Sequence, residues 1–249
     1  RLSIFLIHHS LISGPIFSGQ FGKTWKNVEI CQNLSYNVQV RFLPSTSETG
    51  ESMQRQYLNQ NVYEALQSRL HFIFQEFQNI FVSFSGGKDS GLLLNLVLDF
   101  RKKYYPNRRI GVFHQDFEAQ YSVTTEYIER TFARIEKEVE PYWVCLPMAT
   151  RTALSNYEMY WYPWDDEKEE AWVRPMPKHP YVINLRNNPI TTYRYKMHQE
   201  DLARQFCRWY RMRHGNKKTV CLLGIRADES LQRYRGFLNR KCGYQNTCW

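Results

Sequence analysis

The chain has 249 residues, of which 43% are apolar, 16% are aromatic and 23% are charged. This composition excludes disordered and collagen-like chains, because such chains lack the apolar and aromatic residues that build a core. No run approaches the roughly 18 apolar residues that a membrane-spanning helix needs, so we expect no membrane partner.

Basic charge is concentrated near the end of the chain. The formal net charge is +9. Residues 191–249 contain 13 Lys and Arg against four Asp and Glu, so this segment alone carries +9. A local basic surface suits a phosphate-bearing ligand or a nucleic acid, and the plainer alternative is an ordinary solvated basic face.

The six cysteines form neither a C-x-x-C pair nor a Cys-His cluster with zinc spacing. Two of them, Cys145 and Cys221, lie in apolar runs of strand type, where a buried thiol behaves as a small apolar side chain. This usage predicts reduced thiols and a cytoplasmic protein.

Residues 1–52 differ in sequence pattern from the rest of the chain. An early apolar patch and scattered Gly and Ser show no sustained periodicity, and the first methionine is Met53. The patch is broken by two histidines and lacks a clean cleavage site, which argues against a signal peptide. The stretch FSGQFGKT imitates a Walker A loop but has Phe17 where the first glycine is required. We therefore expect a non-native or loosely ordered extension before a domain over 53–249.

Helical and extended patterns alternate after Met53. Asn61, with Glu64 three residues later, predicts a capped helix start, and apolar residues then recur at helical spacing. The predicted helices cover about 61–77, 90–104, 123–139 and 196–213. The predicted strands cover about 79–84, 110–114, 142–146 and 219–225. Because the strands are apolar on both faces, this order predicts a doubly wound α/β fold, a mainly parallel sheet with helices on both faces.

An aromatic and acidic insertion at about 157–180 interrupts this alternation. It contains three tryptophans and carries a net charge of −5 between Tyr157 and Trp172, and its prolines argue against one long helix. Either the insertion is a packed excursion whose acids only solvate it, or it covers the ligand site or receives a partner.

The sequence SGGKDS, residues 85–90, joins the strand predicted at 79–84 to the next helix. Two glycines without Cβ atoms let the backbone turn tightly and point successive N–H groups at one concavity. Lys88 adds a cation, and the following helix adds the positive end of its dipole. The segment therefore suits a phosphate, pyrophosphate or sulfate.

The stretch GVFHQDFEA places Asp116 and Glu118 just past the second predicted strand, at the same edge of the sheet as the loop. A carboxylate there would hold Mg²⁺ or a ribose hydroxyl, and the alternative is a solvated loop acid. His114 is placed for a general base, although a lone His at a strand end is more often structural.

The stretch LGIRADESLQRYRG follows the fourth predicted strand. Arg226 and Arg233 are seven positions apart, near two helical turns, so they share one face of a helix. Guanidinium groups there would bind oxyanions, and the alternative is ion pairing with Asp228 or Glu229.

The SGGKDS loop resembles the PP-loop of the N-type ATP pyrophosphatases and the phosphoadenosine phosphosulfate (PAPS) reductases, which share an adenine nucleotide alpha hydrolase-like fold. Residues 57–244 resemble the PAPS reductase-like family, and more narrowly the IbrA-like coactivators of prophage gene expression, which are paired with a ParB-like partner. NVYEAL, VSFSGGKDSGLLLNLV, HQDFEA and GIRADESLQRYRG carry this resemblance. Members of that subgroup are longer at the C-terminus, so we expect a truncated chain.

The resemblance implies which residues bind the nucleotide. The implied anion cradle consists of Ser85, Gly86, Gly87, Lys88, Asp89 and Ser90. Arg226 and Arg233 would grip anionic groups of the ligand. The leading hypothesis is that the loop binds ATP with Mg²⁺ and that an unknown acceptor attacks the α-phosphate. Asp89 and Asp116 would then hold the metal, while Lys88 and Arg226 neutralise the phosphates.

Two other functions stay open. A nucleotide-sensing regulator would act with a ParB-like partner and contact nucleic acid through the basic C-terminal region. A PAPS reductase would need a nucleophilic cysteine in an E-C-G-L-H tail, which this sequence lacks, although Cys242 lies beside Lys241 and Arg240. The paired cysteines of an iron–sulfur adenylylsulfate reductase are also missing.

Overall fold

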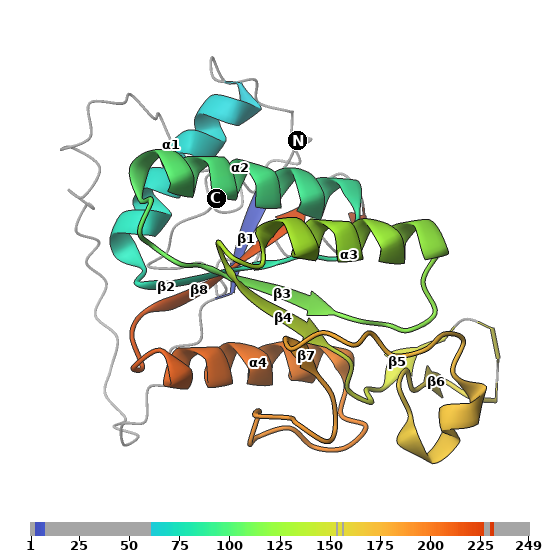
Figure 1. The fold of residues 1–249 in the computed structure, drawn as a ribbon. Coiled ribbons are helices and arrows are strands. Elements are labelled where there is room, and N and C mark those ends of the chain that lie inside the picture. Colours follow the sequence, from blue (N-terminus) through green and yellow to red (C-terminus); the bar gives the residue numbers. More distant parts are fainter. Residues whose placement is uncertain (1–2, 8–60, 153, 156, 227–229, 232–249) are drawn as a thin grey trace, which may run out of the picture. The chain divides into compact units, whose positions relative to one another are not determined.

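The computed structural model describes residues 3–7, 61–152, 154–155, 157–226 and 230–231 (Figure 1). The chain divides into two compact units, one of Arg1–Ser10 with Gln60–Trp249 and one of Leu11–Asn59, and all described residues belong to the first. Apart from 3–7, the predicted extension over 1–52 lies outside the described residues. So do Arg233, Cys242 and Cys248.

Helix α1 (Val62–Glu76) begins as the sequence predicts. Asn61 Oδ1 accepts the backbone N–H of Glu64 at 2.9 Å, and Glu64 Oε2 accepts the backbone N–H of Asn61 at 3.2 Å. This reciprocal capping box satisfies two N–H groups that the first turn of a helix otherwise leaves without a partner.

A six-stranded sheet with the order β1-β8-β2-β3-β4-β7 forms the centre of this unit. Its members are β1 (Ser3–Ile7), β2 (Asn79–Ser83), β3 (Gly111–Gln115), β4 (Glu140–Val144), β7 (Val182–Ile183) and β8 (Thr219–Ile225). All neighbouring pairs are parallel except β1 with β8. The predicted doubly wound α/β fold is confirmed.

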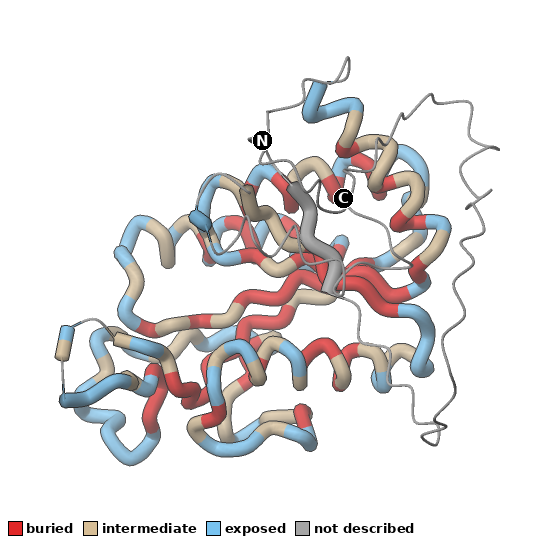
Figure 2. The backbone as a smooth tube through the Cα atoms, turned by 180° about the vertical axis from the view of Figure 1, so that it is seen from behind, coloured by how far each residue is buried: buried red, intermediate tan, exposed pale blue. Residues whose placement is uncertain are grey.

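Helices cover both faces of the sheet (Figure 1). One face carries α1, α2 (Lys88–Tyr104) and α3 (Ser122–Ile135), and the other carries α4 (Gln199–Arg213). Successive side chains of β2 lie on opposite faces of the sheet. Phe81 packs in the core cluster with α4, while Val82 packs in the cluster with α1, α2 and α3. Figure 2 shows β2, β3, β4 and β8 as largely buried, as expected of strands covered on both sides.

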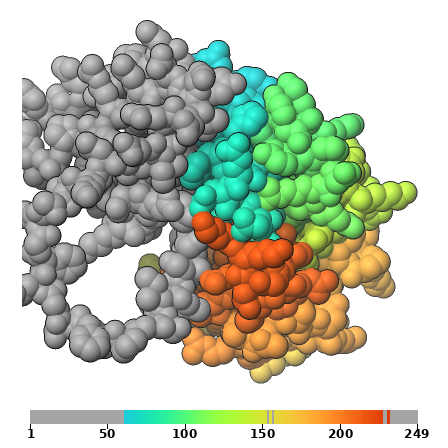
Figure 3. All heavy atoms as spheres, turned by 90° about the vertical axis from the view of Figure 1, so that its left-hand side faces the viewer, coloured from blue at the N-terminus to red at the C-terminus, as the bar shows by residue number. Residues whose placement is uncertain are grey.

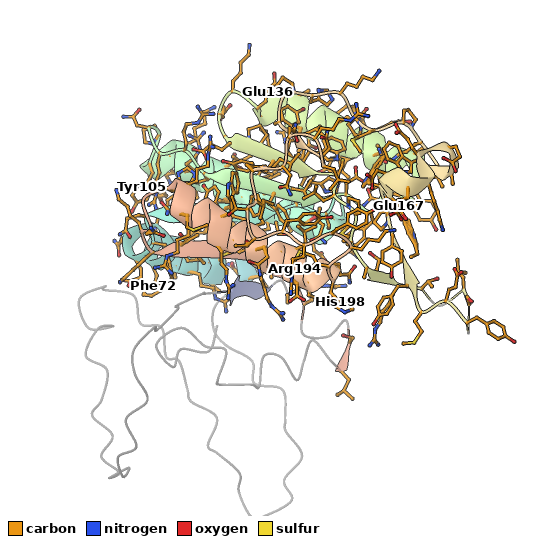
Figure 4. The ribbon with its side chains drawn as sticks, turned by 90° about the horizontal axis from the view of Figure 1, so that it is seen from below. Phe72, Tyr105, Glu136, Glu167, Arg194 and His198 are labelled. Atoms are coloured by element: carbon orange, nitrogen blue, oxygen red, sulfur yellow. The ribbon has the colours of Figure 1, made fainter. Side chains whose placement is uncertain are left out.

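The boundaries differ from the predicted ones where loops intervene. The helix predicted from 196 begins only at Gln199, because Lys196 has a positive φ of 56° and His198 is the extended N-cap (labelled in Figure 4). The helix predicted to 139 ends at Ile135. The 157–180 insertion contains no long helix: β6 (Tyr160–Trp161) pairs with β5 (Thr150–Arg151), and a short 3₁₀ helix, η2, covers Asp166–Ala171.

None of the helices in the described part of the chain combines the length and apolarity that crossing a bilayer demands. Cys145 and Cys221 are buried, as their apolar runs predict; Cys207 is also buried, and all three thiols are free.

Candidate functional site

The SGGKDS loop lies where β2 ends and α2 begins, at the carboxyl edge of the parallel strands. Gly86 has a φ of +81°, and a Cβ at this position would lie 2.7 Å from two side-chain carbons of Ile128 and 3.0 Å from Thr124. Only glycine meets both conditions. Gly87 differs, because its φ is −77° and a Cβ there would approach nothing closer than Ser85 Oγ at 3.5 Å.

Two serine hydroxyls hold the loop closed. Ser90 Oγ accepts the backbone N–H of Ser85 at 3.2 Å, donates to the carbonyl of Gly87 at 3.0 Å, and lies 3.0 Å from Ser85 Oγ. The N–H of Gly87 points at Ser85 Oγ at 3.4 Å. Ser85 and Ser90 therefore shape the turn, while the ligand contact predicted for them stays a prediction.

The remaining N–H groups of the loop are open. Among the described residues, no protein group accepts from the backbone N–H of Gly86, Lys88, Asp89 or Ser90, and the N-cap Gly87 provides no side-chain cap. Lys88 is exposed, and no ion pair in the described part of the chain involves its ammonium. Uncapped N–H groups at the positive end of a 17-residue helix, beside a lysine, favour an anion.

Strand β8 brings Arg226 to this loop. Arg226 Nε lies 3.4 Å from Asp89 Oδ2, and both side chains are partly buried. Two residues earlier, a Cβ on Gly224 would lie 2.7 Å from the carbonyl oxygen of Asp89. The absence of a side chain at Gly224 therefore lets β8 press against the first turn of α2. Arg226 therefore lies beside the loop, while the role predicted for it in binding phosphates stays a prediction.

Asp116 is fully buried and fully hydrogen-bonded. Both of its carboxylate oxygens lie 2.6 Å from Arg174 Nη2, Trp143 Nε1 donates to Oδ2 at 2.6 Å, and the N–H of Glu118 donates to Oδ1 at 2.7 Å. Burial by itself raises the pKa of Asp116, but His114 and the Arg174 guanidinium outweigh it and hold that pKa below its usual value. Asp116 is therefore a buried, ion-paired carboxylate and not a solvated loop acid.

Glu118 binds backbone and side-chain groups of the 157–180 insertion, to which Arg174 belongs. Its Oε2 accepts the backbone N–H of Trp164 at 2.7 Å, its Oε1 accepts that of Val173 at 2.8 Å, and its carbonyl accepts from Arg174 Nε at 2.9 Å. Glu118 is buried and has a φ of 60°. Arg174, which the sequence reasoning missed, thus pairs with the Asp116 carboxylate and donates to the backbone carbonyl of Glu118. The sequence feature that could have pointed to Arg174 is a single arginine shortly after the acidic run at 165–170.

The two carboxylates predicted to hold a metal, Asp89 and Asp116, both have partners in the protein. Asp116 already accepts from Arg174, Trp143 and Glu118, and Asp89 faces Arg226. Within the described ranges, no group of three or more His, Cys, Asp and Glu side chains is placed to hold a metal ion. A Mg²⁺ ion that is bound mainly by nucleotide phosphates needs only one or two protein carboxylates, so the metal role predicted for Asp89 and Asp116 stays a prediction.

His114 is buried among aromatic rings. Its Nδ1 lies 2.8 Å from the carbonyl oxygen of Phe84, while its Nε2 has no partner among the described residues. Burial is the largest influence on its pKa and lowers it, although Asp116 and the Phe84 carbonyl oppose this. The ring is T-shaped to Trp143 at 5.2 Å. This environment favours the structural role over that of a general base.

A hollow of about 490 Å³ lies away from the loop, between β4, β7 and the end of α4. Its wall includes Arg109, Glu140, Tyr142, Trp209 and Arg213, which lie at or near the amino ends of the strands. Figure 3 shows orange-red surface residues from around the end of α4 next to cyan to teal surface residues from and around α1. The hollow is therefore separate from the candidate anion site.

Comparisons with known proteins add a relative but no function. No family model matches the chain. The chain is 33% identical over 177 residues to the Escherichia coli K12 protein YbdN, which is described as uncharacterized. The match covers 70% of this chain and 41% of YbdN, so the chain spans less than half the length of that relative.

Proposed function

We propose that the loop from Ser85 to Ser90 binds the phosphate or sulfate groups of an adenine nucleotide. The observation that carries this proposal is the set of N–H groups, from Gly86, Lys88, Asp89 and Ser90, that no protein group uses within the described residues. Lys88 adds a positive charge within the loop, and Arg226 adds one beside Asp89. Each charge-assisted hydrogen bond to an oxyanion contributes about 1.5–3 kcal/mol.

The reaction that we propose is adenylation. An acceptor oxygen attacks the α-phosphorus of ATP, the bond from that phosphorus to the α,β-bridging oxygen breaks, and pyrophosphate leaves with the electron pair. The loop N–H groups and Lys88 would stabilise the charge that develops on the pyrophosphate. The acceptor is not identified by any residue of the site.

Calorimetry with ATP, PAPS and AMP, combined with a pyrophosphate assay, tests this proposal. Lys88→Ala should weaken nucleotide binding about 10-fold or more, as expected from losing one charge-assisted bond. Lys102→Ala removes a lysine from the exposed last turn of the same helix and should leave the affinity unchanged. Equal affinities for both variants would contradict the loop assignment.

A regulator that senses the nucleotide is the second candidate. On this proposal the chain acts with a ParB-like partner and contacts nucleic acid through its basic C-terminal region. Arg204, Arg208 and Arg211 recur on α4 at spacings that put them on one helix face, which supports it. Nucleotide binding without pyrophosphate release, together with DNA binding that weakens steeply with salt, would favour the regulator.

A PAPS reductase is the third candidate, and the described cysteines do not support it. Burial raises the pKa of Cys207 to about 11 and raises those of Cys145 and Cys221 well above the usual value. Such thiols stay protonated and do not attack sulfur. Cys242, the candidate nucleophile, lies outside the described residues. The free, buried thiols agree with the cytoplasmic location that we propose.

A further inference from the structure

The hollow between β4, β7 and the end of α4 has the size of a small-molecule site. Its volume of about 490 Å³ falls within the range of about 300–1,000 Å³ that ligand sites occupy. The two strands, α4 and the segment before β3 all contribute to its wall. Figure 4 shows α4 running from His198, at its start, toward the side of the unit where Tyr105 is labelled. Charged, aromatic and proline side chains from these elements line one common space.

Two arginines line the hollow without a carboxylate partner. Arg109 Nη2 donates to the carbonyl oxygen of Val139 at 2.5 Å, and its other guanidinium N–H groups have no partner within the described residues. The Arg213 guanidinium carbon lies 5.6 Å from the Trp209 ring centroid. None of the ion pairs in the described part of the chain includes either guanidinium. Both arginines are exposed, so a carboxylate can bind them without breaking an internal ion pair.

Glu140 gives the same hollow one negative charge and a spare oxygen. Its Oε2 accepts from the Tyr142 hydroxyl at 2.9 Å and lies 3.0 Å from His214 Nε2. Burial, together with Glu140, raises the pKa of Tyr142, so its hydroxyl stays protonated and donates to Glu140. Glu140 Oε1 has no hydrogen-bond partner within the described residues. The carboxylate is thus held by one oxygen, and the other can accept from a ligand.

Apolar side chains make up much of the remaining wall. Pro141, Pro180 and Pro189 line the hollow and are half-buried or exposed. The Tyr142 and Trp209 rings meet edge to face at 5.4 Å, and both residues are buried. Proline has almost no side-chain freedom to lose, and packing already holds the two aromatic rings. The wall therefore loses little entropy when it binds a ligand.

We propose that this hollow binds a free α-amino acid with a large apolar side chain. The carboxylate of the ligand would contact Arg109 and Arg213, its ammonium would donate to Glu140 Oε1, and its side chain would cover the proline surface. Two guanidinium groups and one carboxylate match a zwitterion better than a plain anion, because a plain anion would leave Glu140 facing negative charge. Inorganic phosphate would also leave the proline surface in water.

This amino acid is not the acceptor of the proposed adenylation. Arg109, Glu140 and Arg213 lie at or near the amino ends of the strands, whereas the anion loop lies at their carboxyl edge. The five residues of β3 separate the two edges by about 16 Å. The inference therefore does not rest on nucleotide binding. Lys88→Ala, which should weaken nucleotide binding, should leave amino acid binding unchanged.

Calorimetry with the whole chain tests the proposal with L-phenylalanine and four matched probes. N-acetyl-phenylalanine lacks the ammonium, phenylalaninamide lacks the carboxylate, glycine lacks the side chain, and inorganic phosphate is a plain anion. We expect L-phenylalanine to bind at least about 10-fold more tightly than each probe, as the loss of one charge-assisted hydrogen bond or of the apolar contact predicts. The indole N–H signal of Trp209 should shift in the NMR spectrum during the same titration, which locates the ligand.

Two variants remove the charges that the ligand would meet. Arg213→Gln should weaken L-phenylalanine binding at least about 10-fold, and Glu140→Gln should abolish the preference over N-acetyl-phenylalanine. Arg130→Gln and Glu126→Gln, at exposed positions of α3 on the other face of the sheet, are matched controls and should bind as the unchanged chain does. Because Arg213 is exposed, its replacement should leave the thermal unfolding midpoint unchanged.

Three outcomes would overturn the proposal. Absence of L-phenylalanine binding at millimolar concentration would mean that the hollow takes no amino acid. N-acetyl-phenylalanine or inorganic phosphate that binds as tightly as L-phenylalanine would identify a general anion site. L-phenylalanine binding that is unchanged in both Arg213→Gln and Glu140→Gln would place the ligand elsewhere on the chain.

Discussion

Arg174 places Nη2 2.6 Å from both carboxylate oxygens of Asp116, across 58 positions of the sequence. The Asp116 side chain is inaccessible to solvent and that of Arg174 is 17% exposed. This pair joins the 157–180 insertion to the chain just past the end of β3. Glu118 holds the same insertion by accepting the backbone N–H groups of Trp164 and Val173.

Removing one member of this pair should destabilise the protein strongly. Arg174→Met leaves the buried Asp116 carboxylate uncompensated, which costs about 3–5 kcal/mol. Urea unfolding measures the change. Arg204→Ala breaks an exposed pair with Asp201, whose side chains are 55% and 35% exposed, and should cost at most about 1 kcal/mol. Equally small losses in both variants would mean that the Asp116 pair is not formed.

The two loop glycines should respond differently to alanine. Gly86→Ala forces a Cβ against Ile128 at a φ of +81° and should cost about 1–3 kcal/mol of stability. Gly87→Ala makes only an ordinary contact with Ser85 Oγ at 3.5 Å and has an ordinary φ, so its effect on stability should be smaller, while its Cβ would border the open N–H groups and weaken nucleotide binding. Thermal unfolding and calorimetry on both variants measure these effects. A fully stable Gly86→Ala protein would rule out the described turn.

A side chain at Gly224 should also destabilise the protein, for a different reason. Its Cβ would lie 2.7 Å from the carbonyl oxygen and 2.9 Å from the carbonyl carbon of Asp89, and backbone atoms cannot rotate away as side chains do. Gly224→Ala should therefore shift the first turn of α2, costing about 1–3 kcal/mol and reducing nucleotide affinity. Urea unfolding and nucleotide titration of this variant provide the check. An unchanged nucleotide affinity would mean that β8 does not position the anion site.

Stability should fall with acid in two separate windows. His114 has a pKa below its ordinary 6.5 in the folded protein, so the unfolded chain binds more protons as the pH falls below about 6.5, and stability falls with it. Asp116 also has a lowered pKa, so its contribution is present above about 3.8 and is lost below that pH. Urea midpoints at a series of pH values should show the upper window, and His114→Phe should remove it. His198→Ala, at an exposed histidine, should keep it.

The sequence predicted the elements whose patterns are local. The capped start of α1 at Asn61, the alternation of buried strands and helices, and the turn at Gly86 all follow from residues close together in the chain. Strand β7 was missed because two residues are too few to show a period. The prediction for Asp116 and Glu118 found their place at the strand end. It missed their partners, because only the folded insertion brings Trp164, Val173 and Arg174 to them.

The most direct measurement of the central claim is the amide spectrum of isotope-labelled protein during titration with ATP or PAPS. We predict that the N–H signals of Gly86, Lys88, Asp89 and Ser90 shift together with nucleotide concentration, while that of Lys102 at the far end of α2 does not. If these four signals stay in place when the nucleotide is saturating, or if only residues of the hollow between β4 and α4 respond, the loop is not the anion site.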